Sequence, residues 1–203
     1  MKRGNLFLLI LVIAAALGIA AVASILRNGL SARAKPTQME AMLARGARRM
    51  AIPSGAQAAQ NPVSSSAENM RVARLHFADH CATCHANDGS GDTMIGQGLY
   101  PKPPDLRSAE TQGLSDGELF WIIENGVRFT GMPAFGGHEG TREDSWKLVR
   151  FLRHLPHLTA EERVEMERYN PKGPEDRKEE QEEEDFLRGD PPQQRSESAH
   201  PHK

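Results

Sequence analysis

The stretch "HCATCHANDGSGD", from His80 to Asp92, contains both cysteines of the chain, Cys81 and Cys84, and His85 follows the second directly. A Cys-x-x-Cys-His sequence is the attachment motif of c-type haem, in which each thiol adds to one vinyl group and the histidine binds the iron. On one helical turn the two sulfurs reach the same edge of the porphyrin, and the next residue is directed beneath its centre. The motif therefore predicts one covalently attached haem c.

Other uses of two thiols need features that this sequence does not offer. A structural zinc site takes four ligands, usually from a second Cys or His pair at short spacing, and no second pair is found. A thioredoxin-type pair sits at a strand-to-helix turn, whereas this sequence has no strand pattern of any length. A disulfide between residues three apart would constrain the chain very little. Haem attachment is therefore the interpretation we adopt.

A second axial ligand is expected for iron in a closed electron-transfer site, and a methionine thioether raises the reduction potential. Of the eight methionines, Met132 lies in "RFTGMPAFGG", between Gly131 and Pro133, where helix packing does not require it. It follows His85 at a distance that lets its loop reach the opposite haem face. Met94 follows His85 closely and belongs to the histidine side. We predict Met132 as the sixth ligand.

Apolar residues at helical spacing predict four short helices. Ser115 with Glu118 and Thr159 with Glu162 have the spacing of capping boxes, Thr141 can cap the third helix, and Pro156 ends it. The predicted segments are 70–80, 114–126, 141–156 and 159–169.

The long segment between the first two predicted helices is rich in glycine and proline, "GSGDTMIGQGLYPKPPDL" at 89–106. Short helices joined by such a loop make a poor hydrophobic core. A covalently bound haem would fill that core. We therefore predict an all-α fold of three to four short helices wrapped around a haem, the fold that the family resemblance described below also implies.

The N-terminus carries Lys2 and Arg3 before an uncharged run from Leu6 to Leu26. At about 1.5 Å per helical residue, this run spans roughly the 30 Å of a bilayer core. The sequence "AVAS" at 21–24 offers a signal-peptide cleavage site, but removable apolar regions are usually about 7 to 15 residues long. We favour a retained transmembrane helix. The arginines and lysine that follow favour a cytoplasmic position, whereas haem attachment requires export, so we expect the haem domain on the outer face.

Charge and composition divide the rest of the chain. The net charge is +4 over 27–70, −2 over 71–160 and −6 over 161–203. Because no positive charge is clustered on the folded part, nucleic-acid binding is not expected. The predicted organisation is a membrane anchor or signal segment at 1–27, a flexible linker at 28–68, a cytochrome c domain at 69–158, a short C-terminal helix at 159–170 and a disordered acidic tail at 171–203.

The linker contains a pattern with two interpretations. Its apolar and basic residues have the spacing of a short basic amphipathic helix that would lie on lipid headgroups. Gly46 interrupts this pattern, and we favour a frayed linker. The residues concerned are Met39, Met42, Leu43 and Met50 on the apolar side, with Arg45, Arg48 and Arg49 as the basic ones.

Residues from about Asn69 to Pro156 resemble a class I monohaem cytochrome c of the bacterial, membrane-anchored type. Phe77 matches the aromatic residue that these proteins use where the first and last helices cross, and "GMPAFGG" matches their methionine loop. Ala73 stands where many members carry glycine at that crossing.

The resemblance also implies residues around the haem. A backbone carbonyl of Pro103 or Pro104 would accept the Nδ1 proton of His85, which orients the ring toward iron. Tyr100 and Trp121 would line the haem edge and contact a propionate, or would be ordinary core residues. The remaining histidines that we expect to face solvent are His76, His80, His138, His154 and His157.

These features predict a one-electron carrier rather than an enzyme, cycling between Fe(II) and Fe(III) in a respiratory chain. Its partners would be membrane-bound or periplasmic redox proteins, and it would be a single-pass protein of the cytoplasmic membrane with its haem domain on the periplasmic face. The alternative is a fixed haem c subunit of a larger membrane dehydrogenase or oxidase. A haem sensor or peroxidase-like enzyme is a third possibility, and it needs an open sixth coordination position.

Overall fold

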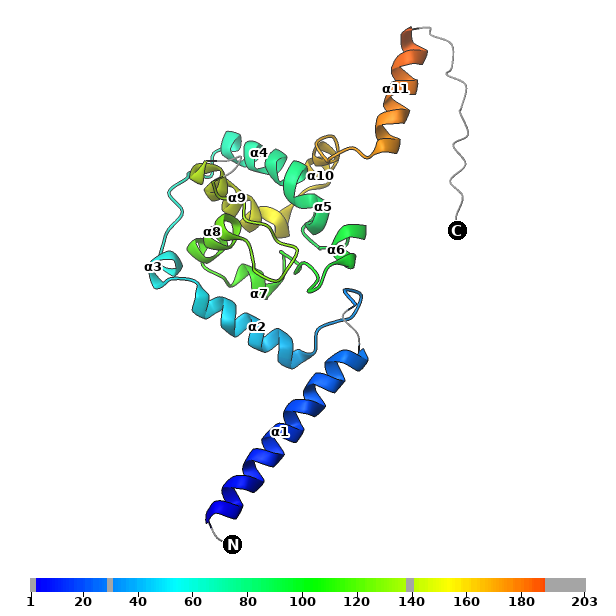
Figure 1. The fold of residues 1–203 in the computed structure, drawn as a ribbon. Coiled ribbons are helices and arrows are strands. Elements are labelled where there is room, and N and C mark those ends of the chain that lie inside the picture. Colours follow the sequence, from blue (N-terminus) through cyan, green and yellow to red (C-terminus); the bar gives the residue numbers. More distant parts are fainter. Residues whose placement is uncertain (1–2, 29–30, 138–140, 189–203) are drawn as a thin grey trace, which may run out of the picture.

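The computed structural model describes residues 3–28, 31–137 and 141–188, and all regular structure in these ranges is helical (Figure 1). No strand occurs among them, which agrees with the predicted all-α class. The helices are α1 (Arg3–Asn28), α2 (Gln38–Ala51), α3 (Ser54–Gln57), α4 (Ala67–His76), a π-helical turn η1 (Phe77–Cys81), α5 (Ala82–His85), α6 (Met94–Gly98), α7 (Ala109–Gln112), α8 (Asp116–Asn125), α9 (Arg142–His154), a 3₁₀ turn η2 (Leu155–His157), α10 (Ala160–Glu167) and α11 (Pro174–Arg188).

The centre of the core is the contact between α4 with its following turn and α9. Phe77 and Phe151 are both buried, and their ring centroids lie 5.2 Å apart with the planes tilted by 57°. Ala73 is buried on α4, so a methyl group is accommodated at this crossing. This arrangement agrees with the expected pairing of the first and last helices of the haem domain.

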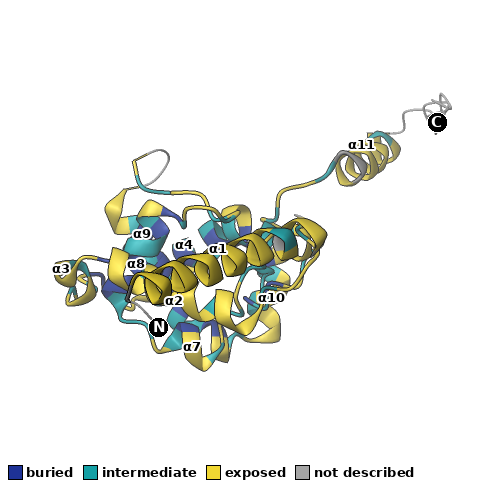
Figure 2. Ribbon diagram, turned by 60° about the horizontal axis from the view of Figure 1, so that its bottom comes forward, coloured by how far each residue is buried: buried dark blue, intermediate teal, exposed yellow. Residues whose placement is uncertain are grey.

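Helix α8 packs on another part of α9 through two aromatic rings. Phe120 and Trp146 stack with a centroid distance of 4.0 Å and an interplanar angle of 9°. The predicted caps of both helices are confirmed, because Ser115 forms a capping box with Glu118, and Thr141 caps α9. These helices bury the predicted apolar faces, as the dark blue segments of α8 and α9 show (Figure 2).

Helix α10 belongs to the same core. Met166 is fully buried. Arg74 of α4 donates hydrogen bonds to Glu162 at 2.7 Å and to Glu165 at 2.5 Å, and both carboxylates lie on α10. The packed unit therefore includes the segment that we predicted as a separate C-terminal helix.

The segment predicted as a flexible linker differs from that expectation. Its second half packs on the domain, because Ile52 and Val63 are buried and Asn61 donates a hydrogen bond to the backbone carbonyl of Trp146 at 2.8 Å. Helix α2 begins with a complete capping box between Thr37 and Glu40. Side-chain hydrogen bonds to distant backbone groups hold this segment, and composition alone does not reveal such contacts.

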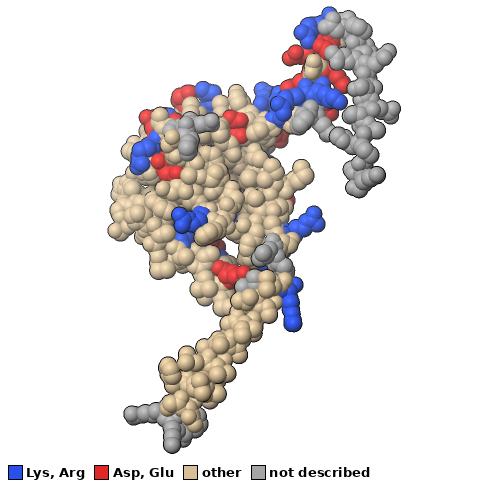
Figure 3. All heavy atoms as spheres, viewed as in Figure 1, with Lys and Arg blue, Asp and Glu red and all other residues tan. Residues whose placement is uncertain are grey.

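The acidic tail also differs from the expected disorder over part of its length. Helix α11 covers Pro174–Arg188 and extends away from the helical domain (Figure 1). Arg188 pairs with Glu184 and Asp185 one turn earlier, and such pairs support an exposed helix. Figure 3 shows acidic and basic side chains together along this arm. Residues 189–203 lie outside the described residues.

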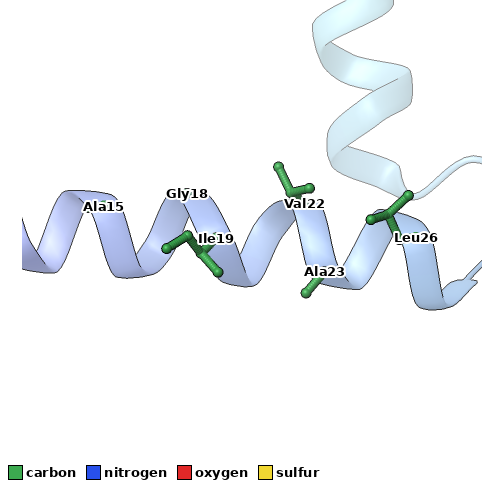
Figure 4. A pocket seen from close by; sticks show the side chains of 6 residues that line it. All are labelled: Ala15, Gly18, Ile19, Val22, Ala23 and Leu26. Atoms are coloured by element: carbon green, nitrogen blue, oxygen red, sulfur yellow. The ribbon is translucent and has the colours of Figure 1, made fainter.

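Helix α1 lies apart from the domain, and the described side chains of its apolar run are almost all exposed. Gly4–Ser24 has a mean hydropathy of 3.0 and is long and apolar enough to cross a membrane. Figure 3 shows this helix as a shaft without charged atoms over most of its length. The shallow depression in Figure 4 is formed by this helix alone, and Ala15, Gly18, Ile19, Val22, Ala23 and Leu26 line it.

The contact between residues 52–63 and α8 gives a direct test of this fold. A Cβ atom at Gly117 would lie 1.8 Å from the backbone carbonyl oxygen of Ala56, whereas a Cβ at Gly55 meets nothing within 4 Å. We expect Gly117→Ala to lower the free energy of unfolding by about 1–3 kcal/mol because α3 and α8 must move apart. Thermal unfolding and limited proteolysis of residues 52–63 measure the effect.

The matched control is Gly55→Ala, which we expect to leave the melting temperature and the proteolysis pattern unchanged. If Gly117→Ala behaved like this control, the packing of residues 52–63 on α8 would be refuted.

Candidate haem-attachment site

The two thiols and the imidazole lie on one continuous helical segment. The π-helical turn η1 ends at Cys81, and α5 continues from Ala82 to His85. Single π-helical turns are frequent at functional sites. Neither cysteine is in a disulfide, and burial, followed by the neighbouring Cys84 thiol, raises the pKa of the Cys81 thiol to about 12. The Cys81 sulfur is thus a neutral thiol, and both cysteines are presented from the same helical segment.

The surroundings of His85 bear on its orientation. Its Nδ1 atom is buried and has no hydrogen-bond partner of ordinary geometry among the described residues. Burial lowers the pKa of His85, and the backbone of Pro104 acts in the opposite direction. Of the two prolines considered, Pro104 is the one whose backbone raises the pKa of His85. The Pro103 carbonyl lies instead against Gly91, where a Cβ would be 2.9 Å from its oxygen.

The backbone turns sharply directly after His85. Ala86 has φ 60° and ψ 158°, a conformation that side chains disfavour and that is often found at functional sites. Gly91 then donates a backbone hydrogen bond to the His85 carbonyl at 2.8 Å, and Leu106 donates one to the Gly89 carbonyl at 2.8 Å. These two hydrogen bonds hold the proline-rich segment that ends at Leu106 close to the turn that follows His85.

The short helix α6 lies within the loop that we predicted to be irregular, and it contacts the turn that carries Cys84 and His85. We did not predict this helix from the sequence. Thr93 caps α6 by accepting a hydrogen bond from Gly96, and its hydroxyl donates to the Thr83 carbonyl at 2.8 Å. A Cβ on Gly96 would lie 2.5 Å from the Cys84 carbonyl oxygen. The sequence indication of this helix was Thr93, a capping residue three positions before Gly96. The glycines around it made the segment resemble an irregular loop.

Hydrogen bonds within the loop fix the backbone at Met132. Met132 donates a hydrogen bond to the Thr130 hydroxyl at 3.1 Å, and its carbonyl accepts one from Val127 at 3.1 Å. Gly126 has φ 63°, and a Cβ there would lie 2.7 Å from the Met132 carbonyl oxygen. Met132 is half-buried. Met94, the methionine excluded above, is 93% exposed.

The methionine loop and the segment that follows α6 meet at Gly131 and Leu99. A Cβ on Gly131 would lie 2.7 Å from a methyl carbon of Leu99. Helix α6 contacts the Cys84 carbonyl through Gly96, and Leu99 directly after α6 contacts Gly131, the residue before Met132. The structure thus brings the proposed attachment segment and the proposed ligand loop into one region.

The two aromatic residues considered for the haem edge occupy different settings. The Tyr100 hydroxyl donates a weak hydrogen bond to Glu40 of α2 at 3.4 Å, so a partner other than a haem propionate already occupies it. Trp121 is half-buried on α8, and its backbone carbonyl accepts a hydrogen bond from Asn125.

Two of the histidines expected to face solvent are partly buried. Burial and the neighbouring His80 lower the pKa of His76, and the two rings lie 4.8 Å apart. His154 contacts Glu162 at 2.9 Å. His76 is the last residue of α4 and His154 the last of α9, and spacing alone did not predict their partial burial. His80 and His157 are exposed, and His138 lies outside the described residues.

The available donors suit a covalently bound haem better than a free metal ion. Two thiols can add to the vinyl groups of haem c, and a half-buried imidazole and a half-buried thioether are the nitrogen and sulfur donors that its iron uses. Among the described residues, no group of three or more His, Cys, Asp or Glu side chains is placed to hold a metal ion. The buried Nδ1 atom of His85 and the nearby backbone of Pro104 fit a histidine whose other ring nitrogen would bind iron.

The close approach of α6 to the cysteine turn generates a prediction. We expect Gly96→Ala to lower the yield of holoprotein with covalent haem, and stability by about 1–3 kcal/mol, because the new methyl group overlaps the Cys84 carbonyl. Intact mass reports the haem content, and thermal unfolding reports stability.

Gly98→Ala is the control in the same helix, since a Cβ there meets nothing within 4 Å. Equal haem content and equal melting temperatures for the two variants would contradict the proposed role of this contact.

Comparison with known protein families agrees with this geometry. Residues 68–152 match the family described as "Cytochrome C oxidase, cbb3-type, subunit III". The matched range begins in α4 and ends within α9, so it contains the cysteine turn, α6 and the methionine loop. No curated protein matches the chain. Residues 68–152 are therefore similar to the cytochrome c domain of this family.

Proposed function

We propose that this protein transfers one electron at a time through a single haem c. In this proposal Cys81 and Cys84 would bind the haem covalently, and His85 and Met132 would bind its iron. The family match carries the assignment. The paired thiols on one helical segment and the hydrogen-bonded methionine loop support it.

The bound haem would supply reversible one-electron chemistry between Fe(II) and Fe(III). The chain would hold its ligands in place. The backbone of Pro104 would hold the Nδ1 proton of His85, which would leave the other ring nitrogen to bind iron. The hydrogen bonds of Met132 with Thr130 and Val127 would keep the thioether in position, and a thioether ligand favours the reduced iron.

We further propose that α1 anchors the domain at the outer face of the cytoplasmic membrane. The length and hydropathy of Gly4–Ser24 support an anchor. Attachment of haem to thiols requires the domain to be exported, which gives the orientation. A tether confines encounters to partners in the same membrane and so raises their effective concentration.

The family match also favours a second candidate, a fixed haem subunit of a membrane oxidase complex. The matched family is described as subunit III of a cbb3-type cytochrome c oxidase. In both candidates the domain passes electrons without transforming a substrate of its own. They differ in whether the domain stays bound to a catalytic subunit.

The choice of axial ligand gives the sharpest test of the proposed electron carrier. We expect Met132→Ala to abolish the weak near-infrared absorption band of methionine-ligated ferric haem and to lower the midpoint potential, because the thioether no longer stabilises the reduced iron. Absorption spectra and a redox titration of the full holoprotein measure both effects.

Met94→Ala is the matched control, since Met94 is 93% exposed and is the first residue of α6. It should retain both the band and the potential. A wild-type holoprotein without the band would favour the haem sensor or peroxidase-like alternative instead.

Purification from membranes separates the two membrane roles. For a mobile carrier we expect the chain to elute from a mild-detergent column apart from any oxidase, with haem c as its single chromophore. Elution at a constant one-to-one ratio with a catalytic subunit would favour the oxidase-subunit candidate.

A further inference from the structure

Helix α2 presents an apolar stripe to solvent. Met39, Met42, Leu43 and Met50 are 67%, 60%, 63% and 84% exposed. At about 100° per residue, these four side chains share one face of the helix with Gly46. Glycine adds no polar group to that face, so the interruption noted in the sequence leaves the stripe continuous. Exposed apolar stripes of this kind mark surfaces that bind a membrane or another protein.

The other side of α2 is attached to the cytochrome domain. Glu40 accepts a hydrogen bond from Tyr100 at 3.4 Å, and Arg45 pairs with Glu110 of α7 at 3.5 Å. At the C-terminal end, Gln57 donates to the Arg49 carbonyl at 3.3 Å, and Ile52 is buried. Turning the stripe inward would break these contacts. The stripe therefore points away from the domain.

The polar residues of α2 have the charge that an anionic surface attracts. The helix contains Arg45, Arg48 and Arg49, and its single acidic residue is Glu40. Glu40 is occupied by the Thr37 capping box and by Tyr100. An apolar face flanked by basic residues is the pattern of helices that lie in the headgroup layer.

The position of α2 along the chain keeps it near the membrane. Helix α1 ends at Asn28 and α2 begins at Gln38. A connection of about ten residues spans at most roughly 35 Å. In Figure 1, α2 runs across the end of α1 rather than continuing its direction. A helix tethered this closely remains within reach of the lipid headgroups.

We propose that α2 binds an anionic lipid surface through Met39, Met42, Leu43 and Met50 and sets the orientation of the haem domain on the membrane. This inference rests on the proposed anchoring by α1. Because Glu40, Arg45 and Ile52 attach α2 to the domain, the domain sits on the membrane through the face that carries Tyr100 and α7. The haem domain is thus held in one orientation and does not swing on a flexible tether.

A partner subunit is the competing occupant of this stripe. The lipid surface is favoured because the stripe lies within a short connection of the transmembrane helix and carries basic flanking residues. The experiment therefore uses lipid alone.

The test uses the full-length holoprotein in nanodiscs with phosphatidylcholine and phosphatidylglycerol. A nitroxide label is attached at Met42→Cys, on the stripe, or at Ala44→Cys, an exposed position on another side of the same helix. We expect the label at 42 to relax mainly with lipid-soluble oxygen and the label at 44 mainly with a water-soluble nickel chelate. Pure phosphatidylcholine should weaken the difference, and Arg49→Gln should lower the lipid-bound population about fivefold.

The outcomes separate this inference from the proposed function. Equal water accessibility at 42 and 44 in anionic nanodiscs would overturn lipid binding by α2, while unchanged haem spectra and chemical reduction would leave electron transfer intact. Protection of position 42 in native membranes but not in lipid nanodiscs would overturn it in favour of a protein partner. Loss of the chain from the nanodiscs would overturn the anchor and this inference together.

Discussion

The backbone carbonyls of Thr83, Cys84 and His85 are bound by the loop that follows them, and the site depends on this contact. The Thr93 hydroxyl donates to Thr83 at 2.8 Å and lies 3.4 Å from the Cys84 carbonyl, and Gly91 donates to His85 at 2.8 Å. These are the carbonyls of a very short helix, which helical hydrogen bonding leaves without partners. The loop satisfies them and, in doing so, fixes the segment that carries the thiols and the imidazole.

The helical frame around this turn is larger than the family match. Residues 68–152 cover the paired helices and the site, but buried side chains before and after this range complete the core. Ile52 and Val63 precede it, and Leu155 and Met166 follow it. A chain with a long glycine- and proline-rich loop gains buried apolar area from such additions. The flanks are therefore part of the folded unit rather than spacers alone.

Local signals in the sequence predicted the helices well. The caps at Ser115, Thr141 and Thr159 lie where the sequence places them, because a cap depends on residues three apart. The apolar spacing of α9 likewise reported its buried face. Local spacing did not predict the short helix α6 within residues 89–106. Thr93, which caps this helix, binds the Thr83 carbonyl of the preceding turn, and this contact is not visible in the local sequence.

The sequence alone determined the all-α class, the anchor-like first helix and the haem-attachment motif, because each depends on residue type and short spacing. Tertiary structure decided that the Pro103 carbonyl lies against Gly91, that Tyr100 contacts Glu40, and that residues 52–63 pack on the domain. These features join residues far apart in the chain through backbone carbonyls and close approaches at glycine. Such contacts leave no periodic pattern, so only the folded arrangement of the backbone reveals them.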